Sequence, residues 1–165
     1  MQGSIVIQVQ PATVVMTGIE FMQYGNHYLE AAEHLAKREP DSWFDPLPYQ
    51  LLCQSLELHL KSFIWLTDRL SRKTIKNKYG HDIEKLRRHA KKRKLSRHCQ
   101  LTQPREEAIK LLGPYYKDRK FAYLDLSMSW EGIPRIRAHP EARAVMTRLC
   151  RKLSKSLHKP LLNAS

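Results

Sequence analysis

Apolar residues recur at intervals of three and four along most of this chain, which is the spacing of one face of an α-helix. The longest stripe predicts a central helix over about residues 46–70, with apolar positions at Tyr49, Leu52, Cys53, Leu56, Leu60, Phe63, Thr67 and Leu70. Shorter stripes predict helices over about residues 17–39, 82–93, 102–113 and 140–158. Amphipathic helices with short connections are typical of an all-α, up-and-down bundle, here of four to five helices.

The expected ends of these helices follow from capping and breaking residues. Thr17 and Glu20 have the spacing of a capping box, and Gly113 followed by Pro114 predicts a helix stop. We expect residues 115–139 to be mostly irregular, with short extended segments at 121–126 and, from alternating apolar residues, at 4–10. The predicted organisation is an N-terminal tail or short strand over 1–16, a single helical domain over 17–158 and a C-terminal tail over 159–165.

Positive charge is concentrated in the second half of the chain, which has 165 residues and a net charge of +13. Residues 1–70 contain four Lys and Arg against eight Asp and Glu, whereas residues 71–165 contain 25 against eight. One basic stretch spans residues 135–159, and a denser, acid-free one spans 85–98. From the denser stretch we predict the nucleic-acid-binding residues Lys85, Arg87, Arg88, Lys91, Lys92, Arg93 and Arg97.

The charge pattern by itself leaves three explanations open. The basic half binds RNA or another polyanion, it matches an acidic protein partner, or it is a solvated face that keeps the protein soluble. Aromatic residues are not interleaved with the basic run, so stacking on single-stranded bases is not supported there. If a nucleic acid binds, we expect contacts to its phosphate backbone rather than to base edges.

Other signatures exclude several classes of chemistry. The common nucleotide-binding and serine-hydrolase motifs do not occur in the sequence, and we predict no cofactor. His27, Glu30 and His34 share one helical face, but a single helix rarely supplies a whole metal site, so we predict no metal. Three cysteines without CxxC spacing, together with no secretory signal and no continuous apolar span, predict a reduced, cytoplasmic protein away from membranes.

Two polar groupings interrupt the helical patterns. Glu57 and Lys61 stand four residues apart inside the most apolar stripe, which predicts a helical ion pair or a buried polar pair near a pocket. Gly80, His81 and Asp82 mark a turn, in which Asp82 caps the next helix and His81 bonds across the bundle. We expect structural rather than catalytic roles for these five residues.

Three segments that contain these residues resemble HEPN-type helical bundles. The segments 48–62, 78–86 and 115–123 are similar, in order and spacing, to small bacterial proteins with an ElxxK helix followed by a GHDL-type turn. The resemblance covers about residues 46–125 and implies a bundle of four or five helices that is often a homodimer. It also implies a family that ranges from metal-independent ribonucleases and toxin components to inactive members that bind nucleic acid or nucleotides.

Catalytic members of that family carry an Arg-x4–6-His motif at a dimer cleft, where the Arg stabilises phosphate charge and the His assists proton transfer. This chain has two formal matches, Arg93 with His98 and Arg151 with His158. About two matches are expected by chance from 14 Arg and eight His in 165 residues. Both pairs are therefore weak catalytic candidates, and the sequence favours a HEPN-like protein without enzymatic activity, with an endoribonuclease as the alternative.

Overall fold

The computed structural model describes residues 17–38, 44–123 and 132–164, and these ranges contain helices and turns but no strand. The helices are α1 (Gly18–Leu35), α2 (Leu47–Asp68), α3 (Arg72–Tyr79), α4 (Ile83–Lys92), α5 (Gln103–Lys117), α6 (Ile133–Arg137) and α7 (Glu141–Leu162), with a 3₁₀ turn η1 (Leu95–Arg97) between α4 and α5. The all-α prediction is therefore confirmed for the described part of the chain.

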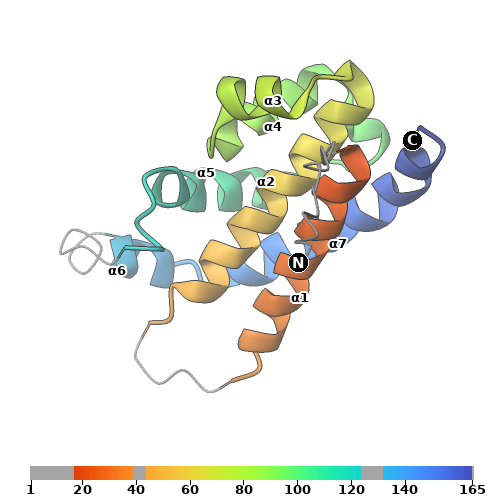
Figure 1. The fold of residues 1–165 in the computed structure, drawn as a ribbon. Helices are drawn as coiled ribbons and strands as arrows, with labels where there is room; N and C mark the ends of the chain where they lie inside the picture. The colour runs from red at the N-terminus through yellow and green to blue at the C-terminus, as the bar shows by residue number, and fades with distance from the viewer. Residues whose placement is uncertain (1–16, 39–43, 124–131, 165) are drawn as a thin grey trace, which may run out of the picture.

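Helix α2 forms the centre of the fold (Figure 1). It packs along α1 and also contacts α7, α4 and α5, while α3 and α4 lie across the end of the bundle where α2 stops. The four residues expected at the heart of the core, Leu52, Leu56, Leu60 and Phe63, are at most 1% exposed. A helix with neighbours on several sides needs apolar residues around most of its circumference. This explains why the apolar stripe of α2 is wider than those of the other helices.

The start of α1 is the predicted one. Thr17 precedes the first helical residue; its side chain accepts from the backbone N–H of Glu20, and its own backbone N–H donates to the Glu20 carboxylate, which together make the capping box. Phe21, Met22 and Leu29 of this helix are buried against the core.

Two helices were not predicted from the sequence. Helix α3 has only Ile75 and Tyr79 as buried residues, so its eight residues show no apolar stripe, and it begins where the Ser71 hydroxyl accepts a hydrogen bond from the Thr74 backbone N–H. Helix α6 is a single turn that buries Ile133 and Ile136. Such short helices are held by tertiary contacts, which a periodicity over longer windows does not detect.

The predicted stop at Gly113 was wrong, because α5 continues through Pro114 to Lys117. A proline lacks the backbone N–H that would donate to the preceding turn, which weakens the helix at this point. The last turn nevertheless stays helical because Tyr116, which is 2% exposed, is packed into the core. Residues 121–123 form a turn rather than an extended segment, and the expected extended residues 4–10 and 124–126 lie outside the described ranges.

Helix α7 also continues past its predicted end at His158, as far as Leu162. Its last turn includes Pro160 and buries Leu161 completely. Residues 159–162 are therefore part of the helical domain and not of a C-terminal tail.

Candidate functional site

A buried carboxylate joins the three segments on which the family resemblance rests. Glu57 of α2 is 1% exposed, and its oxygens accept hydrogen bonds from Lys61 Nζ (2.5 Å), Tyr116 Oη (2.6 Å) and His81 Nδ1 (3.0 Å). Lys61 comes from the same helix, His81 from the turn before α4, and Tyr116 from the end of α5. The predicted pair of Glu57 and Lys61 is confirmed, and it is buried.

The turn at Gly80 completes the environment of Lys61. The Gly80 carbonyl accepts a hydrogen bond from Lys61 Nζ at 2.9 Å, and the residue has φ +53 and ψ −123, a conformation that side chains with a Cβ rarely adopt. Asp82 caps α4 as predicted, through a hydrogen bond of 2.8 Å from the Lys85 backbone N–H. Gly80 and His81 of this turn therefore bond the Glu57–Lys61 pair, whereas Asp82 caps α4.

Tyr116 lies between the Glu57 carboxylate and Gln54. Its Oη lies 2.6 Å from Glu57 Oε2 and 2.7 Å from Gln54 Oε1. A hydroxyl has one proton, and the carboxylate is the stronger acceptor, so the contact with Gln54 is best satisfied when the amide turns its NH₂ toward Tyr116. Burial and the adjacent Glu57 charge raise the pKa of Tyr116 well above its ordinary value, so the phenol stays protonated as the donor.

A surface hollow of about 200 Å³ opens beside this cluster. It is lined by Gln50, Gln54, His81, Tyr116, Arg119, Ala122 and Tyr123. The His81 side chain is 47% exposed, so this residue connects buried Glu57 to solvent. A buried Glu57–Lys61 pair near a pocket was one of the sequence-based expectations, but the lining by Gln50, Tyr116 and Arg119 was not foreseen, because these residues come from α2 and from the segment at the end of α5.

The predicted nucleic-acid-binding residues divide into two groups. Arg87 is 7% exposed and bonds Glu84 of its own helix and Glu106 of α5. Lys91 also bonds Glu106, at 2.5 Å, and Arg88 lies 4.0 Å from Glu84. The two ion pairs with Glu106 fasten α4 to α5.

Arg93 is likewise held by an acidic partner, because its Nε lies 2.8 Å from Asp68 Oδ1 at the end of α2. His89 bonds the other oxygen of Asp68 at 2.7 Å. Arg93 and His89 therefore anchor the C-terminal end of α4 to the central helix.

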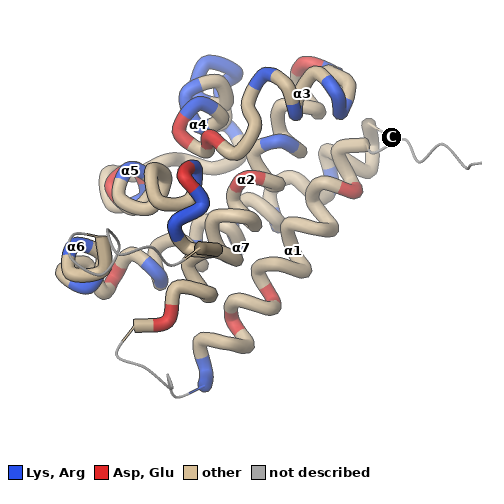
Figure 2. Tube along the Cα trace, turned by 60° about the vertical axis from the view of Figure 1, so that its left-hand side comes forward, with Lys and Arg blue, Asp and Glu red and all other residues tan. Residues whose placement is uncertain are grey.

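The remaining basic residues of this region are exposed. A group of Lys and Arg side chains on α3, α4 and the η1 segment has no carboxylate partner among the described residues, and we call it the α3–α4 basic surface: Arg72, Lys73, Lys76, Lys85, Lys92, Lys94 and Arg97. Figure 2 shows Lys and Arg positions gathered over α3 and α4 at one end of the bundle. Residues 69–98 contain 13 Lys and Arg against two acids, Asp82 and Glu84, so this segment supplies +11 of the net charge of +13.

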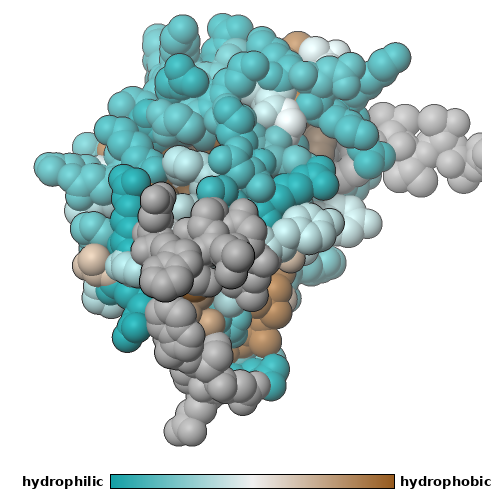
Figure 3. Space-filling view, turned by 90° about the vertical axis from the view of Figure 1, so that its left-hand side faces the viewer, coloured by the Kyte–Doolittle hydropathy of each residue, from teal (hydrophilic) through white to brown (hydrophobic). Residues whose placement is uncertain are grey.

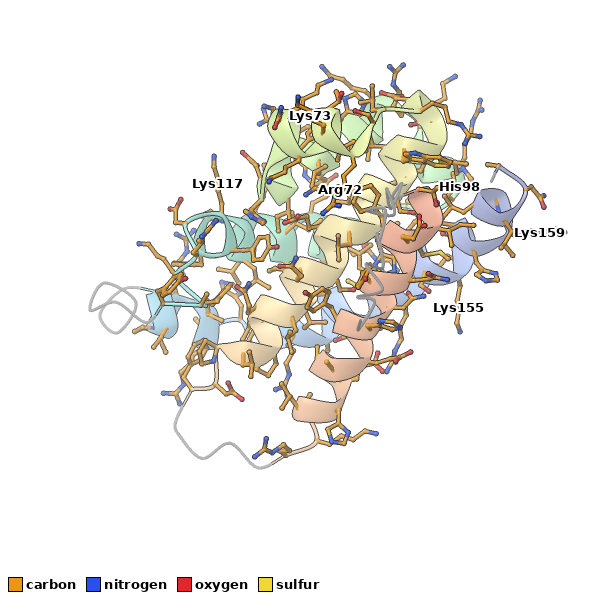
Figure 4. The ribbon with its side chains drawn as sticks, viewed as in Figure 1. Arg72, Lys73, His98, Lys117, Lys155 and Lys159 are labelled. Atoms are coloured by element: carbon orange, nitrogen blue, oxygen red, sulfur yellow. The ribbon has the colours of Figure 1, made fainter. Side chains whose placement is uncertain are left out.

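The second basic stretch runs along α7. Lys155 and Lys159 are exposed one turn apart on this helix, to the right of α1 in Figure 4, whereas Arg72 and Lys73 extend from α3. Burial raises the pKa of the Cys99 thiol, and the nearby charges of Arg105 and Lys152 act in the opposite direction.

The Arg–His pairs suggested by the family motif have other partners. The Arg93 guanidinium bonds Asp68, while the His98 ring packs edge-on to Phe63 with centroids 5.7 Å apart. Arg151 bonds Glu33 of α1 at 2.6 Å, and His158 is exposed on the same helix.

Other expectations concern metals and membranes. In the described ranges no group of three His, Cys, Asp or Glu residues is arranged to hold a metal ion, so His27, Glu30 and His34 do not form such a site. None of the helices described is sufficiently long and apolar to cross a membrane.

Comparisons with known proteins give no relative from which a role can be transferred. No family model, curated protein or solved structure matches this chain.

His59 is a buried polar residue of α2 that bonds outside the Glu57 cluster. The ring is fully buried, its Nδ1 lies 2.8 Å from the Ser55 carbonyl oxygen, and its Nε2 lies 2.9 Å from Asn26 Oδ1. Gly25 leaves room for it, since a Cβ there would lie 3.0 Å from His59 Cε1. Burial lowers the pKa of His59 from 6.5 to about 4.

We expect acid to destabilise the protein through His59. Between pH 6.5 and 4 the unfolded chain binds a proton that the folded chain excludes, so the free energy of unfolding falls by about 3 kcal/mol as the pH is lowered through this window. Urea unfolding at a series of pH values measures the effect. The His59→Asn variant should lose this part of the pH dependence, and an unchanged slope between pH 6.5 and 5 would contradict the assignment.

Proposed function

We propose that the protein binds the phosphate backbone of RNA or another polyanion through the α3–α4 basic surface. The observation that carries the proposal is the concentration of +11 within residues 69–98, together with the seven exposed cations of the α3–α4 basic surface, which have no carboxylate partner among the described residues. Unpaired cations that share one surface repel each other, and a polyanion relieves that repulsion while it releases its own counterions.

The character of the surface supports backbone contacts. The large exposed hydrophobic residues of the described chain, Tyr24, Leu47, Tyr123 and Leu162, all lie outside α3 and α4. In Figure 3 the upper part of the visible face is largely hydrophilic. A surface without exposed aromatic rings offers no stacking platform for bases, so we infer that binding depends on charge and only weakly on sequence.

The family resemblance agrees with this proposal, because inactive HEPN-type proteins include binders of nucleic acid. The endoribonuclease alternative is less favoured, since Arg93 and Arg151 each bond a carboxylate in the described structure. The three cysteines are buried and free, which suits the reducing cytoplasm in which RNA would be met.

The salt dependence of binding to a duplex RNA probe tests the proposal. If about five phosphates are neutralised, the logarithm of the association constant falls against the logarithm of salt concentration with a slope near −4.5. The variant Arg72→Gln/Lys73→Gln/Lys76→Gln/Lys92→Gln removes four charges without breaking an ion pair described above. We expect its slope to be shallower by up to about 3.6, with weaker binding to all sequences alike.

A matched variant controls for the change in net charge. Lys110→Gln/Arg135→Gln/Arg143→Gln/Arg148→Gln removes four exposed cations from α5, α6 and α7, outside the α3–α4 basic surface. We expect it to retain most of the affinity. Binding that does not respond to salt, or an equal loss in both quadruple variants, would show that the α3–α4 basic surface is not the binding site and would favour an acidic protein as the partner.

A further inference from the structure

The hollow beside the Glu57 cluster is electropositive. No acidic side chain of the described residues lines it, while Arg119 and His81 do. Glu57 lies beneath it, and Lys61, 2.5 Å away, balances its charge. A small anion in the hollow would meet a guanidinium and an imidazole without meeting an unpaired carboxylate.

Arg119 occupies a backbone conformation that usually belongs to glycine. It has φ +58 directly after α5, where its N–H donates to the Tyr116 carbonyl and the Lys120 N–H donates to the Tyr115 carbonyl at 2.8 Å. These two bonds form the Schellman motif that ends many helices. Arg119 takes the left-handed backbone conformation of this motif, which is unfavourable for residues with a Cβ. A strained arginine at the edge of a hollow points to a functional demand for its side chain.

His81 is oriented by the buried cluster. A carboxylate oxygen can only accept, so the proton of His81 lies on Nδ1 and is donated to Glu57 over 3.0 Å. The ring also packs edge-on to Tyr116, with centroids 6.0 Å apart. Nε2 has no hydrogen-bond partner among the described residues and is the polar atom that His81 can offer to a ligand.

Gln50 supplies a third, independent sign of a ligand. Its Oε1 is buried without a hydrogen-bond partner, although the residue lines the hollow. Buried polar atoms of native proteins are nearly always paired, so an unpaired acceptor in the wall of a hollow indicates a missing donor. A hydroxyl group of the bound molecule would satisfy it.

We propose that this hollow binds the phosphate group of a small phosphorylated ligand. Arg119 donates to the phosphate oxygens, His81 Nε2 accepts a hydrogen bond from the protonated oxygen of a phosphate monoanion, and Gln50 accepts a hydrogen bond from a hydroxyl of the ligand. Tyr123, which is 69% exposed at the edge of the hollow, flanks the rest of the molecule. The site is separate from the α3–α4 basic surface and does not depend on RNA binding.

Titration of ¹⁵N-labelled protein with inorganic phosphate, at constant ionic strength, tests the proposal by NMR. We expect saturable shifts at His81, Tyr116, Arg119 and Tyr123, and weaker binding of acetate. Arg119→Gly should weaken phosphate binding at least about tenfold, because it removes a charge-assisted contact. The same substitution should raise the melting temperature, because it relieves the left-handed strain. A residue with a merely structural role would not show this combination of weaker binding and higher stability.

Arg69→Gly is the matched control, because Arg69 is also an arginine with positive φ, +52, but it neither lines the hollow nor belongs to the α3–α4 basic surface. It should leave phosphate binding unchanged. His81→Gln should weaken phosphate binding without affecting the duplex probe. Shifts that do not saturate, acetate binding equal to phosphate binding, or an Arg119→Gly variant with unchanged affinity would each overturn the proposal, and none of these results bears on RNA binding by the α3–α4 basic surface.

Discussion

Replacing Glu57 by alanine is expected to lower the free energy of unfolding by about 3–5 kcal/mol. The substitution leaves Lys61, which is 7% exposed, as a buried charge without its carboxylate, and it also removes the acceptor of Tyr116 and His81. An unpaired buried charge is more costly than the absence of the whole pair. Urea unfolding followed by circular dichroism measures the loss.

A double variant separates the contribution of the charge from that of packing. In Glu57→Gln/Lys61→Met both charges are absent, yet an amide oxygen remains for Tyr116 and His81, so we expect most of the lost stability to return. If Glu57→Ala alone loses less than about 1 kcal/mol, the carboxylate is not the buried centre described above.

The second large effect concerns the apolar centre of α2. Leu56→Ala should lower the free energy of unfolding by about 2–5 kcal/mol, because the side chain is fully buried and its removal leaves a cavity between helices. The matched control is Leu162→Ala at the end of α7, where the side chain is 54% exposed and the expected loss is below about 0.5 kcal/mol. A loss below about 0.5 kcal/mol for Leu56→Ala would show that α2 is not the central helix.

The two proposed binding sites lie on different parts of the molecule and suit different ligands. The α3–α4 basic surface is exposed and rich in charge, and such surfaces bind extended polyanions through many weak contacts. The hollow beside Tyr116 is small and has few polar groups, each with a defined orientation, as sites for small molecules do. The substitutions above test the two proposed sites separately.

Sequence periodicity was sufficient for the long helices. Leu52, Leu56, Leu60 and Phe63 repeat at helical spacing over many turns, so the burial of one face of α2 follows from the residues alone. The capping residues Thr17 and Asp82 were also identified correctly, because a cap depends on residues three positions apart. The positive charge of residues 85–98 was also evident without a structure, because it depends only on neighbouring residues in the chain.

Interactions between distant residues decided the rest. Arg87 and Lys85 look alike in the sequence, yet Arg87 is buried against Glu106, which follows it by 19 positions, while Lys85 is exposed. Helix α5 continues through Pro114 because Tyr116 is packed in the core. That packing involves residues distant in the chain, so the local sequence around Pro114 does not predict it.

The sequence by itself determined the helical class, the main core face and the segregation of charge, since each depends on residues close together in the chain. Only the tertiary structure decided which cations are unpaired and that Glu57, His81 and Tyr116 meet at one hollow. The physical reason is that burial and pairing depend on which helix faces pack together, and 59 residues separate Glu57 from the Tyr116 hydroxyl that bonds it.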